Sequence, residues 1–158
     1  MNQSNDPART FGSLAAVLEF AIQREIEAAE SYGRLAGRSR QAAARSLLLD
    51  LQKEEKKHEE ILRNLAAGRL VPLFHQEVLD LKISDYVLEE PVDADSGFQD
   101  LLILAAKKEA KAAALYTDLR SRVDDPEYRR LFDFLIQEER EHKLRLEKEY
   151  EQHVLEEN

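Results

Sequence analysis

Two pairs of side chains in this sequence have the types and the spacing of metal ligands. Glu55 and His58 are three positions apart in the first half, and Glu139 and His142 repeat that spacing in the second half. Residues three apart are neighbours on one face of a helix, so each pair can present a carboxylate and an imidazole to the same point. Oxygen and imidazole ligands without sulfur suit iron or manganese, although affinity alone does not exclude zinc or copper.

An internal repeat connects these pairs to further polar residues. Two stretches of the first half align without a gap, and at one constant offset, with two of the second half: 25–32 with 109–116, and 51–62 with 135–146. The alignment matches Glu25 with Glu109 and Tyr32 with Tyr116. Shared helix composition is a weak explanation for the repeat, because the strongest matches are specific polar residues rather than Ala and Leu.

Four long helices are predicted to carry these residues. Apolar residues recur at helical spacing, while the five Gly and four Pro lie mostly at the ends of periodic segments. We expect helices at about 13–37, 40–67, 97–122 and 126–153, with Ser39 and Asp125 as the N-caps of the second and fourth.

The connections between the helices predict the topology. Residues 68–96 form a segment too long for a tight turn, which predicts a crossover between the second and third helices. Two helical hairpins joined by a long crossover make an all-α four-helix bundle of ferritin-like topology. We expect residues 13–158 to form this single domain and residues 1–12 to be a disordered tail.

The periodicity also predicts that the candidate ligands point into the core of the bundle. Glu25 and Glu109 share the apolar faces of the first and third helices, and Leu51 and Leu135 lie close to the faces of the Glu/His pairs. Several buried carboxylates are untenable without compensation, because an unpaired buried charge is costly. Two divalent cations would neutralise four carboxylates. The predicted metal ligands are therefore Glu25, Glu55, His58, Glu109, Glu139 and His142.

Smaller and aromatic residues accompany each lone glutamate. Ala28 and Ala112 lie one turn beyond Glu25 and Glu109 and would leave room for the metal pair. Tyr32 and Tyr116 lie two turns beyond, where they could orient a ligand carboxylate or simply pack in the core. The remaining glutamates near these motifs fall beside the inward face and are expected to be solvated: Glu27, Glu30, Glu54, Glu59, Glu60, Glu138 and Glu141.

At these motifs the chain resembles the rubrerythrin branch of the ferritin-like di-iron carboxylate superfamily, over residues 13–150. The resemblance implies two iron ions, with manganese or zinc as substitutes, that cycle between ferrous and ferric states with hydrogen peroxide or oxygen. It also implies that the two carboxylates of the Glu/His pairs bridge the irons, the two lone glutamates are terminal ligands, and each histidine caps one iron. The candidate catalytic residues are Glu55, Glu139, Tyr32 and Tyr116.

Two departures from the rubrerythrin pattern bear on function. Rubrerythrins proper carry a rubredoxin domain with four cysteines, whereas this chain has no cysteine, so we expect a separate electron donor protein such as a rubredoxin. Rubrerythrins also place an additional Glu three residues after the third-helix ligand, where this sequence has Ala112. The remaining six-ligand set resembles the symmetric centre of bacterioferritins.

Composition bears on the partners and the location of the protein. With 23 Lys and Arg against 32 Asp and Glu, the formal net charge is −9, which argues against a nucleic-acid partner. No apolar stretch is long enough for a membrane span, and no secretory signal is visible, so the expected location is the cytoplasm. Ferritin-like bundles often pair through their first two helices, so a homodimer is a further expectation.

Three functions are compatible with such a site. The leading hypothesis is a di-iron oxidoreductase that reduces hydrogen peroxide or oxygen at the expense of ferrous iron or an external donor. The alternatives are a ferritin-like protein that oxidises iron for storage, and a structural metal-bound bundle without turnover. The number of irons per chain distinguishes storage from the other two.

Overall fold

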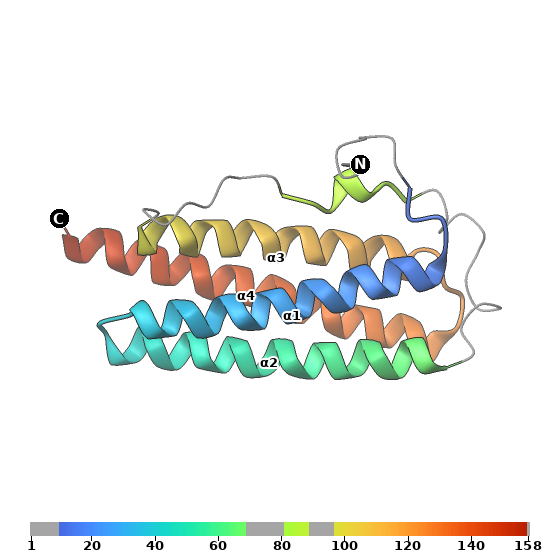
Figure 1. Cartoon of the computed structure of the whole chain (residues 1–158), viewed down its shortest axis with the longest axis horizontal. Coiled ribbons are helices and arrows are strands. Elements are labelled where there is room, and N and C mark those ends of the chain that lie inside the picture. Colours follow the sequence, from blue (N-terminus) through green and yellow to red (C-terminus); the bar gives the residue numbers. More distant parts are fainter. Residues whose placement is uncertain (1–9, 69–80, 89–96, 158) are drawn as a thin grey trace, which may run out of the picture.

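Four long α-helices account for most of the chain in the computed structural model, which describes residues 10–68, 81–88 and 97–157 (Figure 1). The helices are α1 (Leu14–Arg38), α2 (Ala42–Ala67), α3 (Phe98–Arg120) and α4 (Pro126–Glu157), with a short 3₁₀ helix η3 (Ile83–Asp85) between α2 and α3. The part of the chain that the structure describes contains no β-strand and only one isolated bridge, between Thr10 and Lys82.

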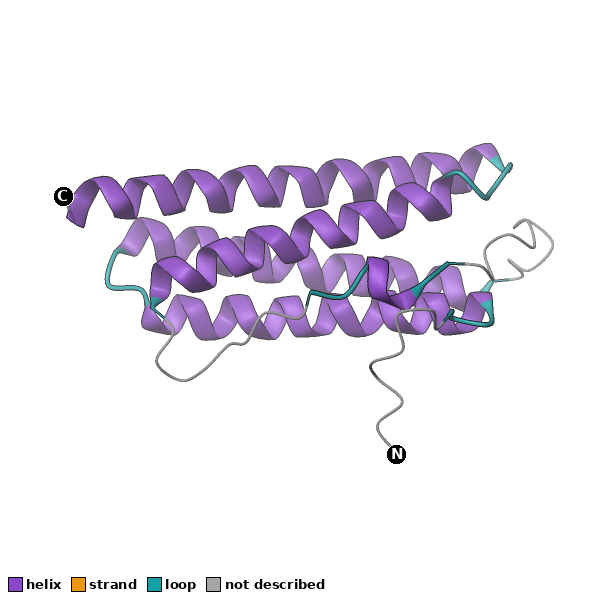
Figure 2. Cartoon of the chain, turned by 90° about the horizontal axis from the view of Figure 1, so that it is seen from above, coloured by secondary structure: helices purple, strands orange, loops and turns teal. Residues whose placement is uncertain are grey.

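The helices pair as two hairpins. α1 packs most extensively against α2, and α3 against α4. Because α2 and α3 run in the same direction along the bundle, the chain must return over its full length between them (Figures 1 and 2). The predicted all-α four-helix bundle with a long crossover is therefore confirmed.

The helix ends follow the local sequence in part. The carboxylate of Asp125 accepts hydrogen bonds from the backbone N–H groups of Glu127 (2.9 Å) and Tyr128 (3.2 Å), so it caps α4 as predicted. Ser39 does not cap α2, whose N-cap is Gln41. The Ser39 hydroxyl donates instead to the Gln41 carbonyl oxygen at 3.1 Å, and the N-cap of α2 makes no side-chain capping hydrogen bond.

The predicted N-terminal tail and crossover are described only in part. Residues 1–9, 69–80 and 89–96 lie outside the described residues. Thr10 and Phe11 differ from the expectation of a tail, because the Phe11 N–H donates to the Leu81 carbonyl oxygen at 3.3 Å. The Phe11 ring also packs edge-on against Phe20, with 5.1 Å between ring centroids. Apolar burial of this ring therefore attaches the segment to the bundle.

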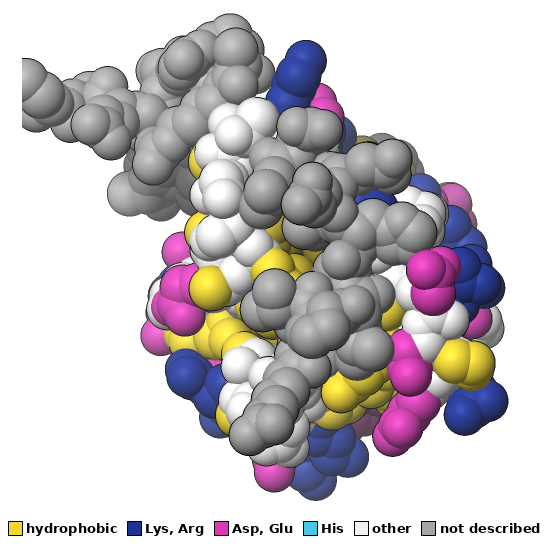
Figure 3. Space-filling model, turned by 90° about the vertical axis from the view of Figure 1, so that its right-hand side faces the viewer, with side chains coloured by type: hydrophobic (Ala, Val, Ile, Leu, Met, Phe, Trp, Pro, Cys, Tyr) yellow, Lys and Arg dark blue, Asp and Glu magenta, His cyan; other side chains and the backbone are white. Residues whose placement is uncertain are grey.

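The apolar core consists of two clusters with a polar layer between them. One cluster gathers around Val17, Leu62 and Phe132, and the other around Leu48 and Leu102. The candidate ligands occupy the helical turns between these two clusters. Apolar packing therefore holds the helices together on both sides of the ligands. At one end of the bundle, charged side chains of both signs surround apolar ones (Figure 3). Among the described helices, none has an apolar stretch long enough to cross a bilayer.

Candidate metal centre

All six predicted ligands converge in the polar layer between the two apolar clusters. α1 and α3 each contribute one glutamate, and α2 and α4 each contribute a Glu/His pair. Every one of these side chains is at most 3% exposed: Glu25, Glu55, His58, Glu109, Glu139 and His142. Helical periodicity explains this burial, because each residue lies on the stripe of its helix that also carries core leucines or alanines.

The six side chains form two overlapping groups of possible ligands. Glu25 and His58 form one group with Glu55 and Glu139, and Glu109 and His142 form the other with the same two glutamates. Within each group, one ligand atom per residue lies within 4.8 Å of all the others. Glu55 and Glu139 therefore lie between two sites, where a carboxylate can contact an ion on either side.

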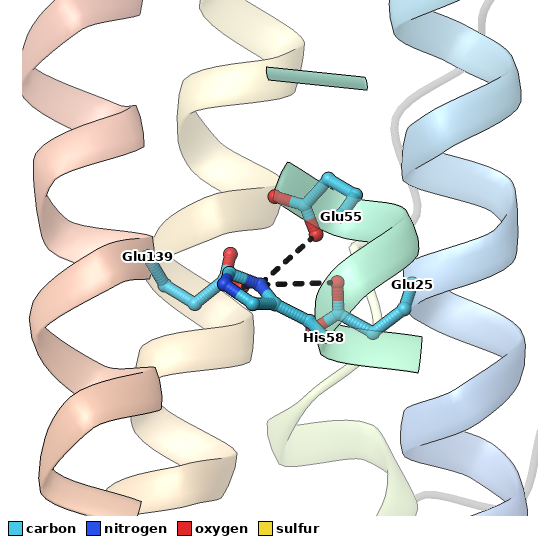
Figure 4. A group of neighbouring side chains, drawn as sticks. All are labelled: Glu25, Glu55, His58 and Glu139. Atoms are coloured by element: carbon cyan, nitrogen blue, oxygen red, sulfur yellow. Dashed lines mark hydrogen bonds and ion pairs between the residues drawn. The ribbon is translucent and has the colours of Figure 1, made fainter. Parts of the chain in front are cut away.

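The first group is drawn in Figure 4, where the four side chains point toward one another from α1, α2 and α4. Nδ1 of His58 lies 2.8 Å from a carboxylate oxygen of Glu139, 3.6 Å from one of Glu25 and 3.7 Å from one of Glu55. The imidazole thus presents Nδ1, and not Nε2, to the carboxylates.

The second group repeats this geometry with the two halves exchanged. Nδ1 of His142 lies 2.6 Å from a carboxylate oxygen of Glu55 and 3.7 Å from one of Glu109. Each histidine therefore makes its shortest contact with the Glu of the other half's Glu/His pair. The two imidazole rings are stacked, with 5.6 Å between centroids. The sequence repeat has become an approximate two-fold symmetry around the site.

The two tyrosines connect the halves in the same reciprocal way. The Tyr116 hydroxyl donates to Glu25 at 2.5 Å, and the Tyr32 hydroxyl donates to Glu109. Burial and the negative charge of the nearby carboxylates raise the pKa of both phenols well above the ordinary value. Both hydroxyls therefore keep their protons and act as donors. Of the two predicted alternatives, the structure favours orientation of the carboxylates over packing alone.

Burial and mutual repulsion separate the pKa values of the carboxylates. Burial raises the pKa of Glu55 well above its ordinary value, and the charges of Glu109 and Glu25 raise it further. Burial would also raise the pKa of Glu25, but contacts with Glu55 and His58 and the hydrogen bond from Tyr116 outweigh it and lower the pKa. Without metal, the site thus favours the protonated form of Glu55 and the ionised form of Glu25.

Both histidines respond to the same negative field. Burial alone would lower the pKa of His58, yet its contact with Glu25 and the charge of Glu25 raise it. His142 behaves alike, since the contact with Glu109 and the charges of Glu109 and Glu54 outweigh burial and raise its pKa. The site therefore attracts positive charge, which protons supply when metal is absent.

Two buried carboxylate oxygens of the site indicate that it suits cations. One carboxylate oxygen of Glu25 and one of Glu109 have no hydrogen-bond partner among the described residues, and both are buried. Buried polar atoms normally have hydrogen-bond partners. Carboxylate oxygens without a partner in such a cluster are therefore available to bind a metal ion. Four carboxylates and two imidazoles match the charge and donor preference of two divalent first-row metal ions. The individual roles of bridging, terminal and capping ligands stay predictions.

Glu54 contacts the site although the sequence did not predict it. It was expected to be solvated, but its carboxylate lies 2.7 Å from Nε2 of His142 and 3.2 Å from the Arg145 guanidinium. Its repeat partner Glu138 is only 21% exposed and lies 3.7 Å from Nε2 of His58. The signal was present in the sequence, because both glutamates match in the repeat and directly precede Glu55 and Glu139. Helical position alone places both glutamates beside the inward face and does not predict their contacts with the histidines.

The structure is a ferritin-like four-helix bundle with a buried cluster of carboxylates and imidazoles that could hold two metal ions. Comparisons with known proteins agree. The rubrerythrin family model matches residues 5–66. A hypothetical protein of Pyrococcus furiosus is 32% identical, with a TM-score of 0.70 over 88% of this chain and 89% of that one. None of the curated proteins matches the sequence significantly.

A second solved structure supports the fold. It is a protein of Thermotoga maritima described as a candidate ferritin-like diiron-carboxylate protein, 19% identical, with a TM-score of 0.69 over 93% of this chain and 98% of that one. Over residues 5–66 the chain is similar to the rubrerythrin family, and its fold is that of ferritin-like bundles.

Proposed function

We propose that the protein is a non-haem di-iron oxidoreductase that reduces hydrogen peroxide or oxygen. The observation that carries this proposal is the pair of overlapping ligand groups that share Glu55 and Glu139 in the buried core. When bound there, two ferrous ions would supply Lewis acidity and one electron each. Glu25, Glu55, His58, Glu109, Glu139 and His142 are the residues that would hold them.

The remaining chemistry belongs to side chains of the chain. Reduction of hydrogen peroxide to two waters consumes two electrons and two protons. Tyr32 and Tyr116 hold protons at their hydroxyl oxygens and orient Glu109 and Glu25, while the apolar clusters on both sides exclude bulk water. The electrons that restore the ferrous state would come from a donor protein such as a rubredoxin.

Iron content and its fate under peroxide test the proposal. Protein purified without added metal is analysed for its elements, loaded anaerobically with Fe²⁺ and then mixed with hydrogen peroxide. We expect two irons per chain, oxidation of both by one peroxide, and retention of both afterwards. Accumulation of many irons per chain would support storage instead, and retained iron that peroxide does not oxidise would support a structural role. A Glu139→Ala variant, which loses a shared carboxylate, serves as the control and should retain less iron.

A further inference from the structure

A cavity of about 180 Å³ lies directly above the candidate metal centre, on the side formed by α1 and α3. Its floor is made by four carboxylates of the site, Glu25, Glu55, Glu109 and Glu139. Small side chains line its walls, notably Ala28 from α1 and Ala112 from α3, which the sequence repeat matches to each other. The cavity therefore joins the carboxylates to the outside of the bundle through a passage bounded by alanines.

On the opposite side of the site, α2 and α4 contribute larger side chains, among them Phe134, which is 47% exposed. The Phe134 ring packs edge-on against His58 at 6.3 Å between centroids. Glu54 joins His142 and Arg145 through hydrogen bonds on the same side. The two faces of the pseudo-symmetric site therefore differ, because the cavity lies on the α1/α3 face and larger side chains border the α2/α4 face.

A segment of the crossover forms the roof of the cavity. We call Leu81–Leu88 the strap; it lies on the α1/α3 side of the bundle, and its last three residues line the cavity (Figures 1 and 2). Arg24 donates to the Tyr86 carbonyl oxygen at 2.9 Å and to the Lys108 carbonyl oxygen at 2.7 Å. The Tyr86 hydroxyl also donates to Asp118 on α3 at 2.5 Å. Arg24 thus ties α1, α3 and the strap together at the mouth.

The volume indicates what the cavity can hold. An apolar cavity of about 150 Å³ is enough for benzene. Part of the 180 Å³ would be taken by the ions, because their carboxylate ligands line it. The remainder suits a molecule of a few non-hydrogen atoms, such as a peroxide or a triatomic anion. Arg24 and Lys108 line the same cavity and favour negative charge at its mouth.

We propose that this cavity is the binding pocket for the small-molecule substrate, and that Ala28 and Ala112 set its size limit. The proposal rests on the proposed di-iron function and specifies through which face of the bundle the substrate reaches the centre. It makes Ala28 and Ala112 specificity-determining residues and Arg24 a positioning residue that holds the strap in place.

Azide, a linear anion of three atoms, is the probe. The iron-loaded, oxidised protein is titrated with azide, and binding is followed by the absorption that appears when azide reaches ferric iron. Ala28→Leu and Ala112→Leu should each weaken azide binding by about tenfold, because the added methyl groups fill the passage. Ala114→Leu is the matched control, since Ala114 is an exposed residue of α3 outside the cavity. It should bind azide as the unaltered protein does.

A substitution at the mouth of the cavity should make azide binding faster rather than weaker. Arg24→Lys keeps the positive charge but loses the guanidinium that donates both to the Tyr86 carbonyl oxygen of the strap and to the Lys108 carbonyl oxygen of α3. Azide should therefore bind several times faster in stopped-flow mixing while two irons per chain are retained. Ala28 is half-buried, so the Leu variant at this position is expected to fold even if that at the buried Ala112 does not, and thermal unfolding monitors both.

The outcomes separate the two proposals. Unchanged azide affinity in Ala28→Leu, with two irons bound, would overturn the pocket and leave the di-iron function standing. Equal weakening in the Ala114→Leu control would also overturn it. Failure of the unaltered protein to retain iron would instead overturn the proposed function.

Discussion

Nε2 of His142 donates a hydrogen bond to Glu54 at 2.7 Å, whereas the repeat-related atoms, Nε2 of His58 and an oxygen of Glu138, are 3.7 Å apart. Arg145 donates to the same carboxylate oxygen of Glu54 at 3.2 Å. Within the described residues, Nε2 of His58 has no hydrogen-bond partner. The two halves of the site thus have the same ligand residues but differ in the contacts that the outer nitrogens of the two histidines make.

This difference predicts unequal metal affinities. A carboxylate that accepts from the outer nitrogen of a histidine fixes the orientation of the ring, and its loss typically costs about 10–100-fold in metal affinity. We expect Glu54→Ala to weaken one of two Mn²⁺ sites by roughly tenfold, and the matched variant Glu138→Ala to have a smaller effect. Isothermal titration calorimetry of the metal-free protein measures both. Equal losses in the two variants would contradict the asymmetry.

The shared carboxylates predict a second contrast among variants. His58 belongs to one ligand group, while Glu55 belongs to both. His58→Ala should therefore weaken one metal site far more than the other, and Glu55→Ala should damage both. Competition with a chelator, followed for each equivalent of Co²⁺, resolves the two sites. Equal and minor losses from the two changes would refute the assigned roles.

The tyrosine hydrogen bonds make a third prediction. Tyr116→Phe removes the donor to Glu25, and Tyr32→Phe removes the donor to Glu109. Hydrogen bonds to charged groups contribute about 1.5–3 kcal/mol, so each variant should lower the free energy of unfolding of the metal-free protein by about that amount. Urea denaturation at pH 7 provides the measurement. If neither Phe variant is measurably less stable, the tyrosines serve only to pack the core.

The pKa shifts predict how stability depends on pH without metal. Glu55, His58 and His142 have raised pKa values in the folded state, so folding favours their protonated forms. Stability from these groups is fully present below their unfolded values and is lost as the pH rises through the folded ones. Glu25 acts oppositely, because its lowered pKa contributes stability above its unfolded value that is lost as the pH falls. The metal-free protein should therefore be less stable at pH 8 than at pH 6, as thermal scans would show.

Metal should reverse that trend. Ligands must be deprotonated to bind, so the stabilisation by Mn²⁺ or Fe²⁺ should grow from pH 5 to pH 8. A hundredfold excess over Kd contributes about 2.7 kcal/mol, which corresponds to a rise in Tm of roughly 5–10 °C for a domain of this length. A scan of metal concentration at pH 7 without any shift in Tm would mean that the buried carboxylates do not bind these ions.

Glu55 should also be the carboxyl whose neutralisation helps the metal-free fold most. Its pKa is raised by burial and by the charges of Glu109 and Glu25, so ionisation at high pH costs stability. Glu55→Gln should therefore raise the Tm of the metal-free protein at pH 8 and lose this advantage near pH 4, where Glu55 is protonated anyway. Glu25→Gln is the comparison variant and should not stabilise, because Tyr116 and His58 already favour an ionised Glu25.

Sequence periodicity was sufficient for the fold and for the members of the cluster. Helical spacing places Glu25, Glu55 and Glu139 on the same stripes as core leucines and alanines, because 3.6 residues complete a turn whatever lies opposite. The long segment between the second and third helices indicated the crossover, because a tight turn does not need that many residues. The repeat then paired equivalent positions in the two halves.

Only the packing of the helices decided which of these residues touch. The bonds from Tyr32 to Glu109 and from Tyr116 to Glu25 depend on how far α1 and α3 slide and rotate against each other, which no single helix encodes. The same holds for the contact of Glu54 with His142. The cavity beneath the strap is lined by one alanine from each of α1 and α3, while a phenylalanine ring packs against His58 on the other face. Periodicity determines the face on which a side chain lies, and tertiary packing determines what lies opposite that face.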